Sequence, residues 1–199
     1  MKVLLCGIAK CENNYIKEWI DWYKKIGIDH ICLYDNNDIN GEKFEDVISD
    51  DIKSGFVEII NYKGKVDCQL EAYTECYKKY GKSYDWLLFL DIDELLDIEH
   101  GDIKDFLSDK RYMDFNGIRV QWKVFDDNGL VRVKNGDYNM YNRFTHPAEE
   151  HSDNYQTKVI VRGKQDGIVY TDSPHYPNNL TSVCNTLGEE VKLEDWLPK

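Results

Sequence analysis

Residues Trp86-Leu87-Leu88-Phe89-Leu90-Asp91-Ile92-Asp93-Glu94 decide the fold that we predict, because an unbroken apolar run leads directly into a cluster of acids. A strand without polar residues is typical of a sheet that is buried on both faces, as in the middle of a largely parallel sheet. The carboxylates that follow such a strand are expected in the crevice where open α/β sheets bind their ligands.

Asp91 and Asp93 are two residues apart, so in an extended segment both side chains point the same way. Two carboxylates held close together repel each other unless a proton or a cation intervenes. This arrangement favours a divalent cation, and a cation at the edge of a sheet usually serves a phosphate group. Taken alone, the pair would be about equally consistent with solvated acids at the end of a strand.

The preceding residues alternate between strand and helix signals. Strand-like runs cover residues 3–8, 30–34 and 56–60, and apolar residues at helical spacing cover residues 16–26, 44–52 and 67–80. This alternation predicts a parallel sheet with helices on both faces. Asn13 or Asn14 is available to cap the first helix, and Gly27 to end it.

After Asp93 the pattern changes. We expect a short helix from Asp102 to Leu107, a half-exposed antiparallel strand over 118–124, and short strands at 129–133, 158–161 and 168–170. Residues 135–154 form a long irregular stretch, which is usually functional or mobile. The whole chain is expected to be a single domain, with residues 1–100 as its nucleotide-binding half and 101–180 as its acceptor and metal half. Residues 181–199 are expected to be a tail that forms an incomplete helix, with truncation of the chain as one option.

Composition excludes several classes of protein. The chain has 199 residues, 42% of them hydrophobic, and a net charge of −12, which argues against nucleic-acid binding. An anionic ligand would therefore need a bound cation to offset the local field. No apolar run is long enough to span a membrane. The six cysteines show no Cys-x-x-Cys pair, which favours a reduced, cytoplasmic protein.

The ordered motifs resemble those of GT-A-fold glycosyltransferases, and among them the family 92 and family 2-like group. The matching segments are Lys10–Asn13 with Tyr15–Trp19, Gly27–His30 with Tyr34–Asn37, Gln69 with Ala72, Tyr73 and Cys76, Phe89–Glu94, and Trp122 and Phe125 with Gly129, then Arg143, Lys158 and His175. The resemblance covers about residues 1–177. An isolated Asp-x-Asp is weak evidence, whereas the ordered set is specific.

The resemblance implies roles by position. It places Ala9, Lys10 and Glu12 beside the nucleotide and Asp35 at its base or ribose. Gln69 belongs to the helix before the metal motif and is expected to help bind the nucleotide-sugar donor. Asp91 would orient the ribose or the metal, Asp93 would ligate the metal, and His175 would complete the metal shell. Mn²⁺ is the favoured ion, with Mg²⁺ as the alternative, because Mg²⁺ is less often bound by histidine.

The roles expected of two basic residues are less specific. Arg143 and Lys158 would bind diphosphate oxygens, although an ordinary ion pair explains each about equally well. Trp122 is expected to pack in the core first and to serve as a platform for a sugar second.

The resemblance also implies an inverting displacement, in which a carboxylate deprotonates the acceptor hydroxyl. The candidates are Glu149 and Glu150 in the long irregular stretch, and Asp126 and Asp127 after Trp122. The family usually has glycine where Asp126 stands, so neither of these two aspartates is supported by a motif match. Glu149 or Glu150 is the favoured base.

The resemblance therefore implies a metal-dependent glycosyltransferase that moves a sugar from a nucleotide donor, a UDP-sugar, to a glycan or lipid-linked acceptor. We expect it in the cytoplasm, with peripheral attachment to the inner face of the membrane as an option. A nucleotidyltransferase is one alternative, but it would require a glycine-rich phosphate-binding loop, and Gly7–Lys10 matches such a loop poorly. A binding module without catalysis is the other, and slow Mn²⁺-dependent release of UDP would distinguish the enzyme from it.

Overall fold

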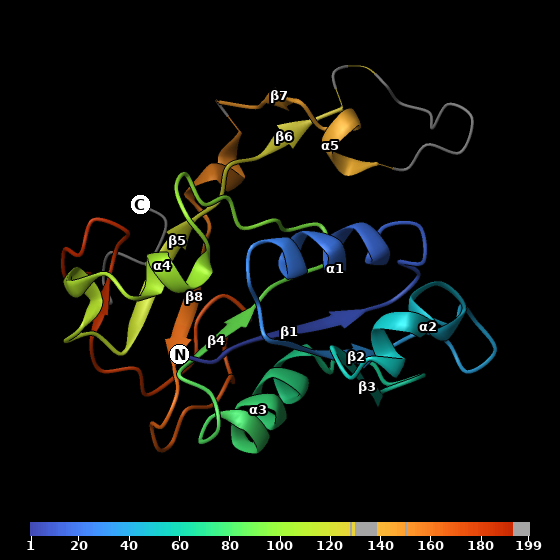
Figure 1. Cartoon of the computed structure of the whole chain (residues 1–199), viewed down its shortest axis with the longest axis horizontal. Helices are drawn as coiled ribbons and strands as arrows, with labels where there is room; N and C mark the ends of the chain where they lie inside the picture. The colour runs from blue at the N-terminus through green and yellow to red at the C-terminus, as the bar shows by residue number, and fades with distance from the viewer. Residues whose placement is uncertain (128, 130–138, 150, 193–199) are drawn as a thin grey trace.

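One central sheet organises the chain. The computed structural model describes residues 1–127, 129, 139–149 and 151–192. In this part of the chain the sheet has the strand order β3-β2-β1-β4-β8-β5-β9 (Figure 1). Its strands are β1 (Val3–Ala9), β2 (His30–Asp35), β3 (Val57–Asn61), β4 (Trp86–Phe89), β5 (Gly117–Gln121), β8 (Thr157–Arg162) and β9 (Val183–Cys184).

The first four strands are parallel. β1 pairs with β2 on one side and with β4 on the other, and β2 pairs with β3. The connecting helices are α1 (Ile16–Lys25), α2 (Glu45–Lys53) and α3 (Gln69–Tyr80). The α/β alternation and the mainly parallel sheet predicted from the sequence are thus confirmed.

Helices cover both faces of this sheet, and β4 contributes to the core on each side. Trp86 and Leu88 pack in one core with residues of α1 and α2, whereas Leu87 and Phe89 pack in the other core with residues of α3. Burying a large apolar side chain contributes about 1.5–3 kcal/mol of stability relative to leaving it exposed. The two-sided burial is the reason why β4 has no polar position.

Helix α1 follows from its sequence except at its first turn. Its buried face is formed by Ile16, Trp19, Ile20 and Tyr23, and Gly27 ends the turn that follows with a φ of +94°. The expected cap by Asn13 or Asn14 is wrong. Tyr15 occupies the cap position and makes no side-chain cap bond, while the carbonyl of Glu12 accepts the N–H groups of Tyr15 and Ile16. A backbone carbonyl thus replaces the expected side-chain cap.

The second half is mainly antiparallel, because β8 pairs in that sense with both β4 and β5. Helix α4 (Ile103–Leu107) begins, as expected, at Asp102, which forms a capping box with Asp105. It is followed by the 3-10 helix η1 (Lys110–Tyr112).

Some boundaries differ from the expectation. β5 stops at Gln121, so the expected strand does not reach residue 124. Residues 168–170 make only an isolated bridge between Val169 and Asn178 rather than a strand. The described part of the tail contains β9 and an isolated bridge from Cys184 to Glu190 instead of a helix. The expected strand at 129–133 lies outside the described residues, apart from Gly129.

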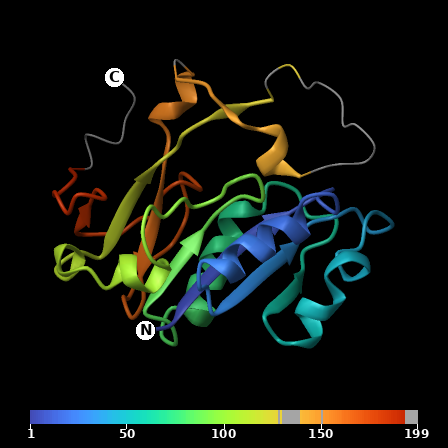
Figure 2. The ribbon, with the colours of Figure 1, turned by 45° about the horizontal axis from the view of Figure 1, so that its top comes forward.

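An arm stands away from the central sheet at the top of Figures 1 and 2. We use the term arm for the described residues between 122 and 156. It contains β6 (Phe125–Asp126), α5 (Met140–Arg143), β7 (His146–Pro147) and the 3-10 helix η2 (Ser152–Tyr155), with β6 and β7 forming a small antiparallel sheet. The stretch expected to be irregular therefore contains short elements in its described part.

Hydrogen bonds tie the described part of the arm to α1 and to Tyr15, which directly precedes it. The backbone N–H of Met140 donates to Oε2 of Glu18 at 2.7 Å, and Arg143 Nη1 donates to the hydroxyl of Tyr15 at 3.1 Å. None of the helices in the described part of the chain has the length and apolar character that crossing a membrane requires.

Candidate functional site

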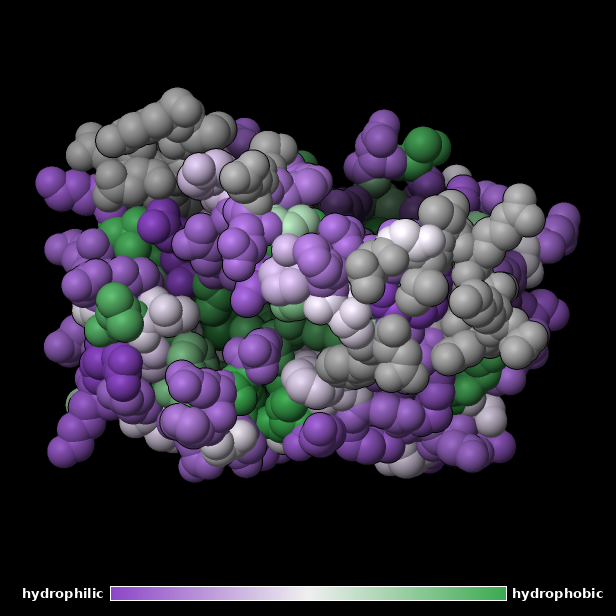
Figure 3. Space-filling model, turned by 90° about the horizontal axis from the view of Figure 1, so that it is seen from above, coloured by the Kyte–Doolittle hydropathy of each residue, from purple (hydrophilic) through white to green (hydrophobic). Residues whose placement is uncertain are grey.

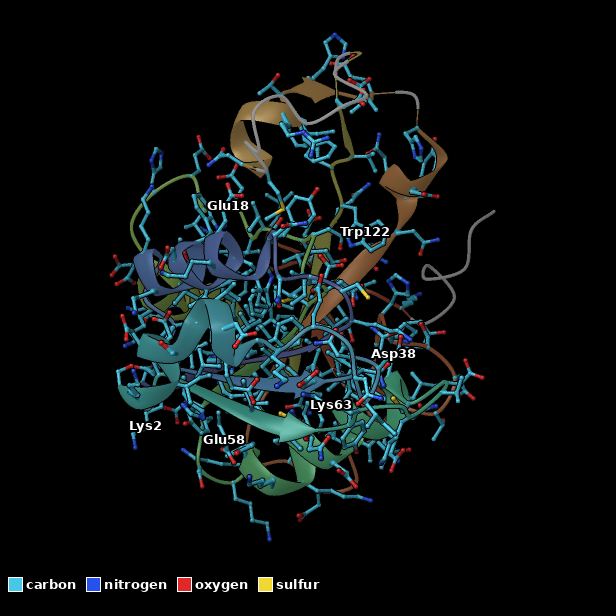
Figure 4. All side chains as sticks on the ribbon, turned by 90° about the vertical axis from the view of Figure 1, so that its right-hand side faces the viewer. Lys2, Glu18, Asp38, Glu58, Lys63 and Trp122 are labelled. Atoms are coloured by element: carbon cyan, nitrogen blue, oxygen red, sulfur yellow. The ribbon has the colours of Figure 1, made fainter. Side chains whose placement is uncertain are left out.

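The candidate site lies where the parallel strands end. Ala9 and Asp35 are the last residues of β1 and β2 and are partners in the strand register, and Asp91 follows β4 closely. Figure 4 looks onto this edge of the sheet, with Asp38 and Lys63 near the strand ends and Trp122 between them and the arm. The face that carries the arm is hollowed, with hydrophobic residues deep in the hollow and hydrophilic residues around it (Figure 3).

Every polar group of Asp91 has a partner within the protein. Oδ1 accepts from Gln69 Nε2 at 2.7 Å and from the Tyr73 hydroxyl at 3.2 Å. Oδ2 accepts from Lys158 Nζ at 2.9 Å. The backbone N–H donates to Glu94 Oε2 at 2.9 Å, and the backbone carbonyl accepts from Trp19 Nε1 at 3.0 Å. Asp91 is therefore a fixed member of the framework.

Helix α1 holds the rest of the acidic segment in place. The Tyr23 hydroxyl donates to the carbonyl of Glu94 and accepts from the N–H of Leu96, both at 3.0 Å. Trp22 Nε1 donates to the carbonyl of Leu96 at 3.0 Å. One face of a helix thus fixes the backbone from residue 91 to residue 96.

Lys158 is a buried cation beneath the acidic segment. Its side chain is 2% exposed, and its Nζ lies 2.9 Å from Asp91 Oδ2 and 3.5 Å from Glu94 Oε2. A charge buried to this extent is tolerated only where opposite charges and hydrogen bonds compensate for lost hydration. Burial raises the pKa of Glu94 to about 7, while the charge of Lys158 acts in the opposite direction.

Asp93 points the other way, toward solvent. Its side chain is exposed, in contrast to that of Glu94. The pKa of Glu12 is raised by its own burial and further by the negative charges of Asp93 and Glu42. Asp93 and Glu12 therefore share one electrostatic environment, next to the exit of β1.

His175 presents one ring nitrogen with a free lone pair. Its Nδ1 lies 3.0 Å from the carbonyl oxygen of Thr157, which can only accept, so Nδ1 carries the proton and Nε2 does not. Burial lowers the pKa of His175, and the charge of Lys158 lowers it further, so both favour the neutral ring. Its ring centroid is 5.3 Å from that of Trp122, whose buried Nε1 has no hydrogen-bond partner in the described structure.

Asp93 and His175 each have the donor chemistry of a ligand to a divalent ion. A neutral imidazole whose other nitrogen donates to a backbone carbonyl is the usual form of a metal-ligating histidine, and an exposed carboxylate is a suitable second ligand. Asp91 fits less well, because a divalent ion at its Oδ2 would lie beside the Lys158 ammonium. Within the described ranges, no three His, Cys, Asp or Glu side chains are arranged to hold a metal together.

A second cluster joins the ends of β1 and β2. Asp35 is 1% exposed, accepts from the N–H of Asn37 at 3.0 Å and lies 3.1 Å from Lys63 Nζ. Its Oδ2 is an ion-pair partner of Lys63 by distance, although the geometry is not that of a hydrogen bond. The side chain of Asn37 accepts from the N–H of Cys11 at 2.8 Å, so the two strand ends are fixed to each other.

The comparison with known families decides the identity of this arrangement. The model of glycosyltransferase family 92 matches residues 6–184, which include both clusters and the acidic segment. The chain belongs to glycosyltransferase family 92. This confirms the predicted family and, at the level of the family, the predicted class of enzyme. The α/β architecture with a mainly parallel sheet that was expected for such an enzyme is the one observed.

Two plant proteins of family 92 are similar to this domain. It is 23% identical to one from Ricinus communis over 135 residues, which cover 66% of this chain and 24% of that protein. It is 27% identical to one from Oryza sativa subsp. japonica over 93 residues, which cover 46% of this chain and 15% of that protein. The matched part is thus about a quarter or less of these relatives' length.

A solved structure is also similar. The crystal structure of S. aureus TarS 1-349 aligns with a TM-score of 0.48 and 13% sequence identity, over 67% of this chain and 39% of that one.

The structure of the family 92 domain unites one group of the predicted site residues. Gln69, Asp91 and Lys158 are joined by hydrogen bonds, and His175 interacts electrostatically with the last two of them. Ala9 and Asp35 lie side by side, and Lys10 extends from the same strand end to an exposed ion pair with Asp38 of 2.8 Å. The burial of Lys158 favours the ion pair over direct contact with a diphosphate.

The predicted catalytic bases lie on the arm of the family 92 domain. Glu149 is exposed in a turn after β7, and the side chain of Asp127 accepts from the N–H of Gly129 at 3.0 Å. Asp126 lies 3.6 Å from His146 Nδ1 across the small sheet, and Glu150 lies outside the described residues. Neither Glu149 nor Asp127 is hydrogen-bonded to residues 91–94, so their role stays a prediction.

Sequence reasoning gave no role to Tyr73 or to Glu94. Tyr73 follows Gln69 by four residues on α3, and this helical spacing places both side chains on the same carboxylate. The spacing was a signal that could have identified Tyr73. Glu94 stands within the acidic segment, but only the fold shows that it turns back onto the N–H of Asp91.

Proposed function

We propose that this family 92 domain transfers a sugar from a nucleotide-sugar donor, a UDP-sugar, to a glycan or lipid-linked saccharide acceptor with the help of Mn²⁺ or Mg²⁺. The observation that supports the proposal best is the acidic segment at the exit of β4, in which a framework aspartate is followed by an exposed one. Family membership supports the reaction class, and the position at the carboxyl edge of a parallel sheet supports nucleotide binding.

Electrostatics is the reason for including a cation. Asp91, Asp93, Glu94 and Glu12 lie near one another, and Lys158 is the buried cation among them. A diphosphate brought to this edge would meet excess negative charge unless a cation came with it. Asp93 and His175 would hold the ion, which when bound would stabilise negative charge on the departing diphosphate.

The other residues of the site have roles in binding and proton transfer. Ala9, Lys10 and Glu12 would line the nucleotide at the exit of β1, and Asp35 would fix its base or ribose. Arg143, held at the start of α1 by Tyr15, would contact diphosphate oxygens. A carboxylate of the arm would take the proton of the acceptor hydroxyl in an inverting displacement, and the candidates remain Glu149, Glu150 and Asp127. The cytoplasmic location stays a prediction.

The test is release of UDP from a UDP-sugar, measured with and without Mn²⁺. We expect slow release that depends on the metal, and a loss of about 10²–10³-fold in Asp93→Asn, comparable to the loss of one preorganised electrostatic contact. Asp97→Asn is the matched control, because Asp97 is also exposed and lies four residues further along.

Three results would contradict the proposal. Equal losses in the two variants would remove Asp93 from the site. UDP binding without release of UDP from any donor would indicate a binding module. Metal-dependent release of pyrophosphate from a nucleoside triphosphate would indicate a nucleotidyltransferase.

A further inference from the structure

Lys158 and Asp91 form an ion pair directly beneath the acidic segment. We propose that Lys158 is a positioning residue for the transfer reaction. Its ammonium group, rather than a divalent ion, neutralises Asp91, so that Asp93 is the aspartate of this segment that ligates the metal. The inference rests on the proposed function and deepens it, because it names the group that neutralises Asp91 and so gives a structural reason for the separate roles expected of the two aspartates.

The sheet places Lys158 at this position. β8 runs antiparallel to β4, with Leu87 opposite Val161. Continuing this register by three residues brings Lys158 level with Leu90, which directly precedes Asp91. Val120 of β5 is its partner on the other side. The pairing with β5 holds the backbone of Lys158, and the burial of its side chain together with the hydrogen bond to Asp91 fixes its ammonium.

The contacts of Asp91 leave little room for a second cation. Its Oδ1 already accepts two hydrogen bonds, from Gln69 and Tyr73. Its Oδ2, on a side chain that is 35% exposed, lies 2.9 Å from the Lys158 ammonium. A divalent ion bound to the same oxygen would be strongly repelled by that ammonium. Asp93 has no ion pair with a cationic side chain in the described part of the chain, and it is exposed to solvent.

The pair predicts a stability pattern that differs between the two aspartates. Removing the charge of Asp91 leaves the ammonium of Lys158, which is 2% exposed, with Glu94 at 3.5 Å as its one remaining counter-ion among the described residues. Breaking one side of a buried ion pair is strongly destabilising, whereas replacing both partners often is not. Neutralising the exposed Asp93 leaves no buried charge uncompensated.

The experiment compares Asp91→Asn, Asp93→Asn, Lys158→Met and the double variant Asp91→Asn/Lys158→Met, with Lys164→Met as control. Lys164 pairs with Asp85 but is exposed. Melting temperatures are measured without metal and over a titration with Mn²⁺. Without metal, we expect Asp91→Asn to melt lower, Asp93→Asn to match the wild type, and the double variant to recover part of the loss.

The metal titration separates positioning from a purely structural role. Asp93→Asn should lose the Mn²⁺-induced shift, whereas Asp91→Asn should keep it, with affinity reduced by about tenfold as for residues that orient ligands. Lys158→Met should bind Mn²⁺ more tightly than the wild type, because Asp91 then lacks its cation. If Lys158→Met does not fold, Lys158→Gln replaces it. Lys164→Met should change none of these Mn²⁺ responses.

The result that overturns the inference is a normal melting temperature for Asp91→Asn together with loss of its Mn²⁺ response, which would make Asp91 a metal ligand. Additive melting shifts in the double variant would also overturn it. Failure of the proposed function looks different. In that case the wild type would show no response to Mn²⁺ or UDP, while the metal-free comparison would still measure the coupling of Lys158 with Asp91.

Discussion

The hydroxyl of Tyr23 holds the acidic segment of the candidate site in place through two hydrogen bonds to its backbone. The side chain is fully buried, and its oxygen both donates to the carbonyl of Glu94 and accepts from the N–H of Leu96. The segment that carries Asp91 and Asp93 therefore depends on a residue of α1. From the sequence, Tyr23 is one more apolar position on a helical stripe, and its second role becomes visible only in the fold.

We expect Tyr23→Phe to destabilise the protein by about 1–3 kcal/mol, because two buried backbone groups lose their partner. It should also reduce metal-dependent UDP release, since the acidic segment would be less firmly held. Urea unfolding and the release assay measure the two effects. Tyr155→Phe is the control, because Tyr155 is 79% exposed. A Tyr23→Phe protein as stable and active as the wild type would refute this role.

At the scale of elements, the described part of the arm is held to α1 through the start of α5. Glu18 accepts the N–H of Met140 at 2.7 Å, so a side chain of one helix caps another that is far away in the sequence. Glu18 stands in the matching segment Tyr15–Trp19, but its partner could not be predicted, because a cap supplied by a distant element has no local signal.

Glu18→Ala should therefore loosen the arm while leaving the central sheet intact. The loss of a helix cap costs about 1 kcal/mol, and here it falls on the arm. We expect faster cleavage within residues 139–156 under limited proteolysis, with little change in global melting temperature. Asp21→Ala is the matched control, because Asp21 lies on the exposed face of the same helix, where it pairs with Lys17. Equal cleavage rates in the two variants would contradict the anchoring role.

The elements of the first half could be predicted because their signals are local or periodic. The apolar run of β4 and the stripe of α1 each follow from neighbouring residues, and in the second half the same holds for the start of α4 after Asp102. The contacts of the site could not be predicted in the same way. Lys158 reaches Asp91 across 67 residues, and His175 reaches the carbonyl of Thr157 across 18. Only the antiparallel addition of β8 to β4 brings them together.

At the scale of the whole molecule, the net charge of −12 acts on every anionic ligand. Long-range repulsion between like charges is screened by salt, with a screening length that falls from about 30 Å at 0.01 M to about 8 Å at 0.15 M ionic strength. In the absence of a divalent ion, we therefore expect UDP to bind more tightly as salt is raised over this range. With saturating Mn²⁺ the local charge is offset, and the same increase in salt should weaken binding.

Isothermal titration calorimetry of UDP binding at increasing KCl concentrations measures both trends. Uridine, which lacks the diphosphate, is the control ligand. Metal-free UDP affinity that falls with salt would mean that cationic side chains, rather than a metal, receive the diphosphate.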